Sequence, residues 1–117
     1  MKKLKVYIAS PYTKGDVAIN VKNSFEAYDI LLKNNFLPFS PLTSHFIHMM
    51  FPQNYNTWME IDLEWLAVCD AVLRLPGESA GADIETDYAE KNNIPVFYNY
   101  NDLIRWNAER EYAFLQK

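Results

Sequence analysis

Short apolar runs of strand length alternate with longer segments of helical period along this chain of 117 residues. Residues 4–9 are rich in β-branched and aromatic side chains and are followed by Ser10-Pro11, a pattern typical of a buried strand. Residues 16–34 repeat apolar side chains with a helical period and end at the turn-forming Asn34-Asn35. Parallel strands need long crossover connections, which are usually helices, so the alternation predicts an α/β fold with a parallel sheet.

The remaining strands are shorter, and one segment resists assignment. Three more strands are expected, at residues 36–39, 71–75 and 94–98. A terminal helix is expected to start at Asn101 or Asp102. Residues 43–55 are dense in aromatic residues, Met and His but have no clear period. The length suits one domain that spans residues 1–117.

Two central helices are predicted from their caps. Thr57 is the expected N-cap of a helix that runs to residue 68, and Ser79 is the expected N-cap of a helix that ends near Lys91. The buried stripe of the first of these helices is expected to contain Trp58, Ile61, Trp65 and Val68.

Charge and cysteine content exclude several classes of partner. The net charge is −4, and the basic residues are scattered except near the start of the chain, which argues against a nucleic-acid partner. Cys69 is the only cysteine, so a disulfide within the chain is excluded and a reducing cytoplasm is expected. No uncharged apolar run approaches the roughly 18 residues that span a bilayer, so we expect a cytosolic protein with no membrane partner.

Ligands of open parallel sheets bind outside the carboxyl ends of the strands, which here draws attention to the loops at residues 10–15 and 76–81. The second loop has small side chains just where a helix begins, so its backbone amides favour an anion. Glu85 follows on that helix and shares a face with Ala82 and Ala89, which predicts a carboxylate in a hollow lined by methyl groups. The alternative is an ordinary exposed helix glutamate.

Asp62 is a second carboxyl group in an unusual place, four residues after Trp58 and three before Trp65. An acid on the apolar edge of a helix is costly unless it is paired or used in function. The alternative is a boundary residue that bonds a neighbouring loop.

Among the remaining polar candidates, Tyr12 is expected to face the ligand from the first loop. His45 and His48 lack the spacing of zinc-binding histidines, so no metal is expected. Neither ligand-facing loop has a Walker lysine or a dinucleotide-binding glycine pattern, and no cofactor is expected.

Several segments taken together resemble one enzyme family. Residues 6–12, residues 62–66 with 69–72, and residues 79–85 with Ala89 are similar to motifs of the nucleoside 2-deoxyribosyltransferase-like superfamily. The likeness is greatest to its small bacterial and phage branch, which is related to the 2′-deoxynucleoside 5′-phosphate N-hydrolases. This resemblance implies a flavodoxin-like three-layer sandwich with a four- or five-stranded parallel sheet.

The resemblance also implies roles for the two carboxyl groups. Glu85 matches the family nucleophile, which attacks the anomeric carbon of the sugar, and Asp62 matches the acid that helps the base to leave. The helix N-terminus is expected to keep Glu85 ionised, and the aromatic surroundings of Asp62 are expected to favour its protonated form. Further substrate contacts are expected from Tyr7, Ser10, Tyr12, His45, Trp58 and Gly81.

Ser79 bears on the substrate, because the N-hydrolases have a serine at this position that contacts a 5′-phosphate, whereas the transferases tend to have an aspartate. We therefore expect cleavage of the base–sugar bond of a nucleoside 5′-monophosphate. The resemblance also implies a homo-oligomer, because members of the family commonly complete the site with a neighbouring subunit. A glycine-poor first loop and Thr86-Asp87 after the nucleophile depart from the family pattern. Transfer of deoxyribose between bases, and a nucleotide-binding module without catalysis, are the alternatives.

Overall fold

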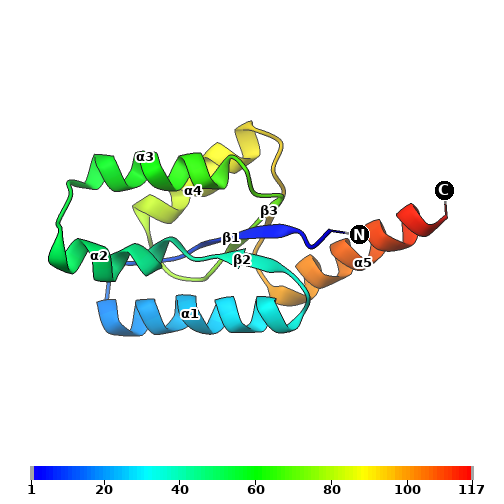
Figure 1. Ribbon diagram of the computed structural model, residues 1–117, viewed down its shortest axis with the longest axis horizontal. Helices are drawn as coiled ribbons and strands as arrows, with labels where there is room; N and C mark the ends of the chain where they lie inside the picture. The colour runs from blue at the N-terminus through cyan, green and yellow to red at the C-terminus, as the bar shows by residue number, and fades with distance from the viewer. Residues whose placement is uncertain (1, 117) are drawn as a thin grey trace.

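Four parallel strands form the sheet of this protein, in the order β2-β1-β3-β4. The computed structural model describes residues 2–116, and Figure 1 shows the strands in the middle layer. Hydrogen bonding pairs Val6 with Ala71 and Ala9 with Arg74, so β1 and β3 end together. The strands are β1 (Lys5–Ala9), β2 (Leu37–Phe39), β3 (Ala71–Arg74) and β4 (Val96–Phe97).

Helices cover both faces of the sheet, as expected for a flavodoxin-like three-layer sandwich (Figure 1). Helices α1 and α5 cover one face, α3 and α4 cover the other, and α2 follows a short 3-10 turn beyond β2. No helix within residues 2–116 is long and apolar enough to cross a membrane. The helices are α1 (Val17–Lys33), α2 (Ser44–Met50), α3 (Tyr55–Leu66), α4 (Ala80–Lys91) and α5 (Tyr100–Leu115), and the 3-10 turn η1 is Pro41–Thr43.

The side chains of β1 point alternately to the two faces of the sheet and so belong to two separate core clusters. Val6 and Ile8 pack beneath α1 and α5, whereas Tyr7 and Ala9 face α3 and α4. Successive side chains of a strand point to opposite faces, so this division follows directly from the sequence of β1. It places the hydroxyl of Tyr7 among the side chains of α3 and α4.

The expected strands and the Ser79 cap are confirmed, but two expectations about helix starts were wrong. Asn54, not Thr57, caps α3, since its side chain accepts a hydrogen bond from the Thr57 amide at 2.8 Å. Asn99 caps α5 in the same way, one residue before the helix begins at Tyr100. In both helices the N-cap is an asparagine that lies earlier in the chain than the expected start, and its side-chain oxygen accepts the capping hydrogen bond. The unassigned segment contains α2.

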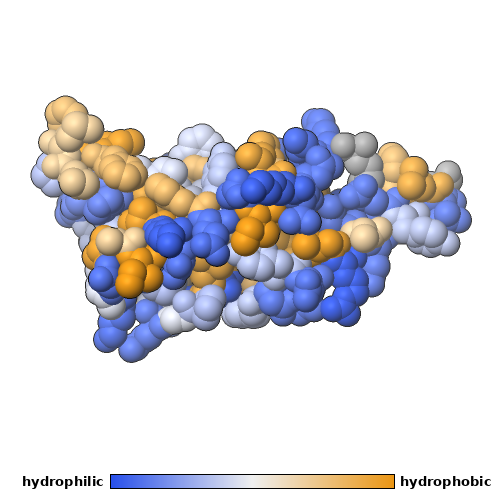
Figure 2. All heavy atoms as spheres, turned by 90° about the horizontal axis from the view of Figure 1, so that it is seen from below, coloured by the Kyte–Doolittle hydropathy of each residue, from blue (hydrophilic) through white to orange (hydrophobic). Residues whose placement is uncertain are grey.

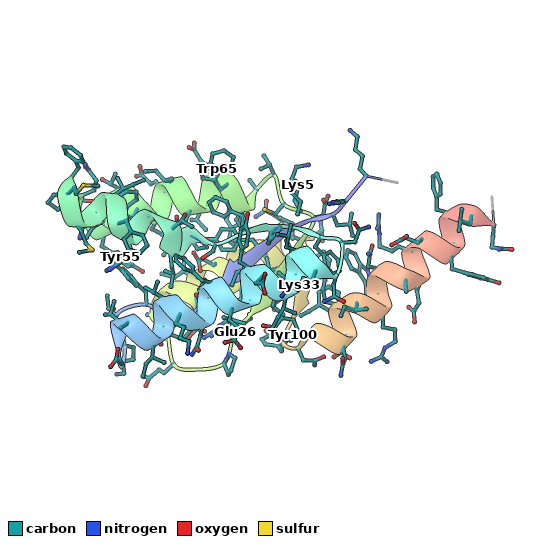
Figure 3. All side chains as sticks on the ribbon, turned by 60° about the horizontal axis from the view of Figure 1, so that its bottom comes forward. Lys5, Glu26, Lys33, Tyr55, Trp65 and Tyr100 are labelled. Carbon is teal, nitrogen blue, oxygen red and sulfur yellow. The ribbon has the colours of Figure 1, made fainter. Side chains whose placement is uncertain are left out.

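The predicted buried stripe of α3 was also wrong in part. Leu66 is the fully buried residue of this helix, while Ile61, Trp65 and Val68 are exposed. Trp65 instead stacks on Phe39 of the edge strand β2, with ring centroids 5.5 Å apart. Figure 3 shows Trp65 and Tyr55 near opposite ends of α3. The helix lies over the border of the sheet, so its aromatic residues cover the rim and remain partly in water.

The loops at residues 10–15 and 76–81 pack closely against each other at a glycine. Gly77 has a φ of +117°, and a Cβ added there would lie 2.9 Å from Cγ of Pro11 in the first loop. Both the left-handed backbone and the close approach require glycine at this position.

Replacing Gly77 by Ala is expected to destabilise the protein more than replacing Gly15 by Ala. Gly15 also has a positive φ, of +85°, but nothing lies within 4 Å of its added Cβ, so it serves as a control for backbone strain alone. We expect Gly77→Ala to lower the free energy of unfolding by about 1–3 kcal/mol more than Gly15→Ala, the usual cost of overpacking. Urea titrations measure both, and equal losses would contradict the steric lock.

Candidate active site

A cavity of about 490 Å³ lies at the carboxyl ends of the strands, a volume suited to a small organic ligand. The first loop, η1, α2, α3 and α4 all contribute to its wall. Both carboxyl groups singled out in the sequence line it, Glu85 from α4 and Asp62 from α3. The cavity therefore brings together side chains that are far apart in the chain.

Glu85 is buried, with only 4% of its surface exposed, which rules out an ordinary exposed helix glutamate. Ala82 and Ala89 share its buried face of α4, as their spacing predicted. On the other side Tyr7, which is fully buried, donates a hydrogen bond from its hydroxyl to Oε2 of Glu85. Tyr7 thus supports the carboxylate from beneath and is not itself part of the cavity wall.

Burial raises the pKa of Glu85 to about 8. The hydrogen bond from Tyr7 opposes this rise, the charge of Asp62 adds to it, and the charge of Arg74 opposes it. The expectation that the helix N-terminus keeps Glu85 ionised was wrong. Glu85 is the sixth residue of α4, and the helix dipole acts within the first turn, so burial outweighs it.

Burial also raises the pKa of Asp62, to about 7, as its aromatic surroundings predicted. Two carboxyl groups that face one cavity and titrate near neutral pH can divide the tasks of base and acid. The hydrogen bond from Tyr7 and the charge of Arg74 favour the ionised form of Glu85, but burial outweighs both. Because the pKa of Glu85 is the higher of the two, a single proton in the free site lies mainly on Glu85, and an ionised Glu85 beside a protonated Asp62 requires a bound group that favours the Glu85 carboxylate.

Small hydroxyl residues form the wall at the start of α4. Ser79 is buried, and its Oγ accepts a hydrogen bond from the Ala82 amide at 3.1 Å, which leaves its own proton to donate to a ligand. Ser10, at the end of β1, is also buried, and within residues 2–116 its Oγ has no hydrogen-bond partner. Gly81 lies under Tyr55, whose hydroxyl would be 3.4 Å from a Cβ added to that glycine.

The aromatic segment, residues 43–55, supplies another part of the wall, and it includes His48, which sequence reasoning considered only as a metal ligand. Tyr12 lines the cavity and bonds His45, with 2.5 Å between Oη and Nδ1, while His45 itself lies outside the wall. His48 lines the cavity and accepts from the indole of Trp58 at 2.8 Å. The expected substrate contact from His45 is therefore wrong, and it is His48, one turn further along α2, that reaches the cavity.

Residues 4–99 match the model of a protein family described as a domain of unknown function, DUF7768. The chain belongs to this family. No curated protein sequence matches this DUF7768 chain. A solved 2-deoxyribosyltransferase from the psychrotolerant bacterium Bacillus psychrosaccharolyticus is similar in structure, with a TM-score of 0.58 and 20% sequence identity. The match covers 79% of this chain and 69% of the other, and at this identity it shows a shared fold.

The buried carboxyl group of Glu85 makes stability depend on pH. Its folded pKa of about 8 exceeds the ordinary 4.5, so its contribution is complete below pH 4.5 and is lost as pH rises through 8. We expect the free energy of unfolding to fall between pH 5.5 and 8, by up to about 1.4 kcal/mol per pH unit for this group.

Urea titrations across this pH range measure the slope, which Glu85→Gln should reduce because the amide does not titrate, leaving the part that Asp62 contributes below pH 7. Glu90→Gln, on the exposed side of the same helix, is the matched control and should keep the slope of the wild type. Parallel profiles for all three proteins would contradict the burial of an ionisable Glu85.

Proposed function

We propose that this protein is an N-glycosidase that cleaves the base–sugar bond of a nucleoside or deoxynucleoside 5′-monophosphate through a covalent glycosyl-Glu85 intermediate. The observation that carries the proposal is the pair of carboxyl groups in one cavity, with Glu85 buried on the hydroxyl of Tyr7. The fold shared with a 2-deoxyribosyltransferase supports the same kind of chemistry.

The two carboxyl groups suit the two halves of a retaining glycosidase reaction. In the first half, a carboxylate oxygen of Glu85 attacks the anomeric carbon, the bond to the base nitrogen breaks with its electron pair on the base, and Asp62 delivers a proton to the base. The positive charge that develops on the sugar favours the ionised form of Glu85. The pKa of Asp62, about 7, lies near neutral pH, so the developing sugar cation can shift the proton from Glu85, whose pKa is about 8, to Asp62.

Water completes the reaction in the second half. Asp62, now ionised, takes a proton from a water molecule as the water oxygen attacks the anomeric carbon, and the bond to Glu85 breaks with its electron pair on the carboxylate. The products are a sugar phosphate and a free base. Tyr7 keeps its proton throughout, because burial raises its pKa well above the ordinary value, and holds Glu85 in place.

Ser79 and the start of α4 support a monophosphate as substrate. The first amides of a 12-residue helix and the remaining proton of Ser79 are donors that an anion prefers. The hydroxyl of Ser10, which has no partner within residues 2–116, lies in the same cavity wall, and so does Lys14, whose ammonium group pairs with the exposed Glu78 at 3.6 Å. With its phosphate bound at the start of α4, the substrate would have its sugar over Glu85 and its base towards α2.

Transfer of deoxyribose to a second base is the other candidate, favoured by the fold shared with the 2-deoxyribosyltransferase. An acceptor base would then replace water in the second half of the reaction.

The homo-oligomer expected from the resemblance stays a prediction, which a molecular mass measured by light scattering would test. Exposed apolar residues at the end that carries α2 offer a surface for it (Figure 2), namely Phe46, Ile47, Met49, Met50 and Phe51.

Incubation with nucleoside monophosphates and nucleosides, with and without an acceptor base, tests the reaction by chromatography of the released base. Glu85→Gln should show no measurable release, because its amide is a poor nucleophile, and Asp62→Asn should be slower by about 10²–10⁴-fold. Glu90→Gln is the control for a neutral glutamine on the same helix. No release from any substrate by the folded wild type would exclude both enzymatic functions.

Substitution of Ser79 by Asp separates monophosphate from nucleoside as substrate. Aspartate caps helices as well as serine does, so α4 should keep its start, while the added charge repels a phosphate. We expect the KM for monophosphates to rise by at least about 10-fold, with nucleoside cleavage affected less. Unchanged kinetics on monophosphates would show that the phosphate binds elsewhere.

A further inference from the structure

His48 is fixed in one tautomer by its neighbours. Its Nδ1 accepts a hydrogen bond from the indole N–H of Trp58 at 2.8 Å and a second from the backbone amide of Gln53 at 3.2 Å. An indole and a backbone amide are donors only, so Nδ1 must carry a lone pair. The proton of the neutral imidazole therefore lies on Nε2.

The donor on Nε2 is available to a ligand. His48, Gln53 and Trp58 all line the cavity, and within the described residues Nε2 of His48 has no hydrogen-bond partner. The imidazole is half-buried and lies edge-on to Trp58, with ring centroids 6.0 Å apart. The segment thus presents one N–H group of fixed position to the cavity, in a wall to which Ser44 and Gln53 also contribute.

With Asp62 at the bond between base and sugar, His48 would face the far edge of the base. Trp58 precedes Asp62 by four residues on α3, a rise of about 6 Å, which is close to the width of a pyrimidine ring. If Asp62 protonates the base near its bond to the sugar, a group attached to Trp58 faces the opposite edge. That edge carries the substituent at position 4 of a pyrimidine or position 6 of a purine.

We propose that His48 selects the base by donating its Nε2 hydrogen to a carbonyl oxygen at this edge, so that oxo bases are preferred over amino bases. This proposal rests on the proposed function, since it takes a nucleoside monophosphate as the ligand. An amino group at the same position meets the Nε2 hydrogen with hydrogens of its own, and two buried donors are left unpaired. Trp58 acts through His48 as a positioning residue.

Binding to matched pairs of monophosphates tests the proposal without requiring turnover. The probes are deoxyuridine against deoxycytidine monophosphate and deoxyinosine against deoxyadenosine monophosphate, which differ mainly in a carbonyl or an amino group at the proposed edge. Calorimetry on the Glu85→Gln variant avoids cleavage during the titration. We expect the oxo member of each pair to bind roughly 10- to 100-fold more tightly.

Two substitutions of His48 distinguish a role in recognising the base from a role in holding residues 43–55 in place. His48→Phe keeps an aromatic ring but has no donor, and should reduce the preference to about 3-fold or less. His48→Gln keeps an amide N–H near Nε2 and should retain part of it. Thermal unfolding shows whether each variant is folded, and nitrogen NMR of the imidazole should show a proton on Nε2 and none on Nδ1.

The outcomes distinguish this proposal from the proposed function. Equal binding of oxo and amino partners, an unchanged preference in His48→Phe, or a proton on Nδ1 would each overturn the role of His48 while leaving the glycosidase intact. A clear preference without base release from the wild type would support the role of His48 and overturn the catalytic part of the proposed function. No binding of any of the four monophosphates would overturn both.

Discussion

A carboxyl group buried against one hydroxyl is the constraint on which this site depends. A charge withdrawn from water is costly unless a donor compensates it, and Tyr7 supplies that donor to Glu85 from the middle of β1. Tyr7 and Glu85 can meet only because α4 lies close to the sheet, which requires small residues on its buried face. Ala82 and Ala89 meet this requirement, so the composition of one helix face controls the chemistry of the cavity.

The turn before α4 is fixed from the other side by Arg74, at the end of β3. Its guanidinium donates to the carbonyl oxygens of Leu75 and Gly77 and pairs with Asp83 of α4 at 3.1 Å. These contacts hold the backbone of the turn that leads to the helix start, and the same positive charge lowers the pKa of Glu85. One side chain therefore orders the loop and favours the ionised form of the buried acid. Asp83 is mostly exposed, so this ion pair contributes to geometry more than to stability.

Local signals predicted most of the fold and the location of the site. These signals depend only on residues that are close in sequence, and all are present in the structure. They are the apolar runs of the strands, the Ser79 cap and the spacing of Ala82, Glu85 and Ala89. The exposure of Trp65 could not be predicted, because it depends on how far α3 extends over the sheet border. The raised pKa of Glu85 likewise depends on burial by segments that are distant in sequence.

The aromatic segment differs physically from the rest of the site, because α2 has no buried residue. Its links to the body are polar or made at the surface, chiefly the bonds of its two histidines to Tyr12 and Trp58 and an aromatic contact between Phe25 and Phe46. A segment that contributes nothing to the core can change in sequence without disturbing the carboxyl pair beneath it. In the proposed function, reaction and recognition would therefore be carried by separate parts of the fold, the first by packed helices on the sheet and the second by a surface helix held by hydrogen bonds.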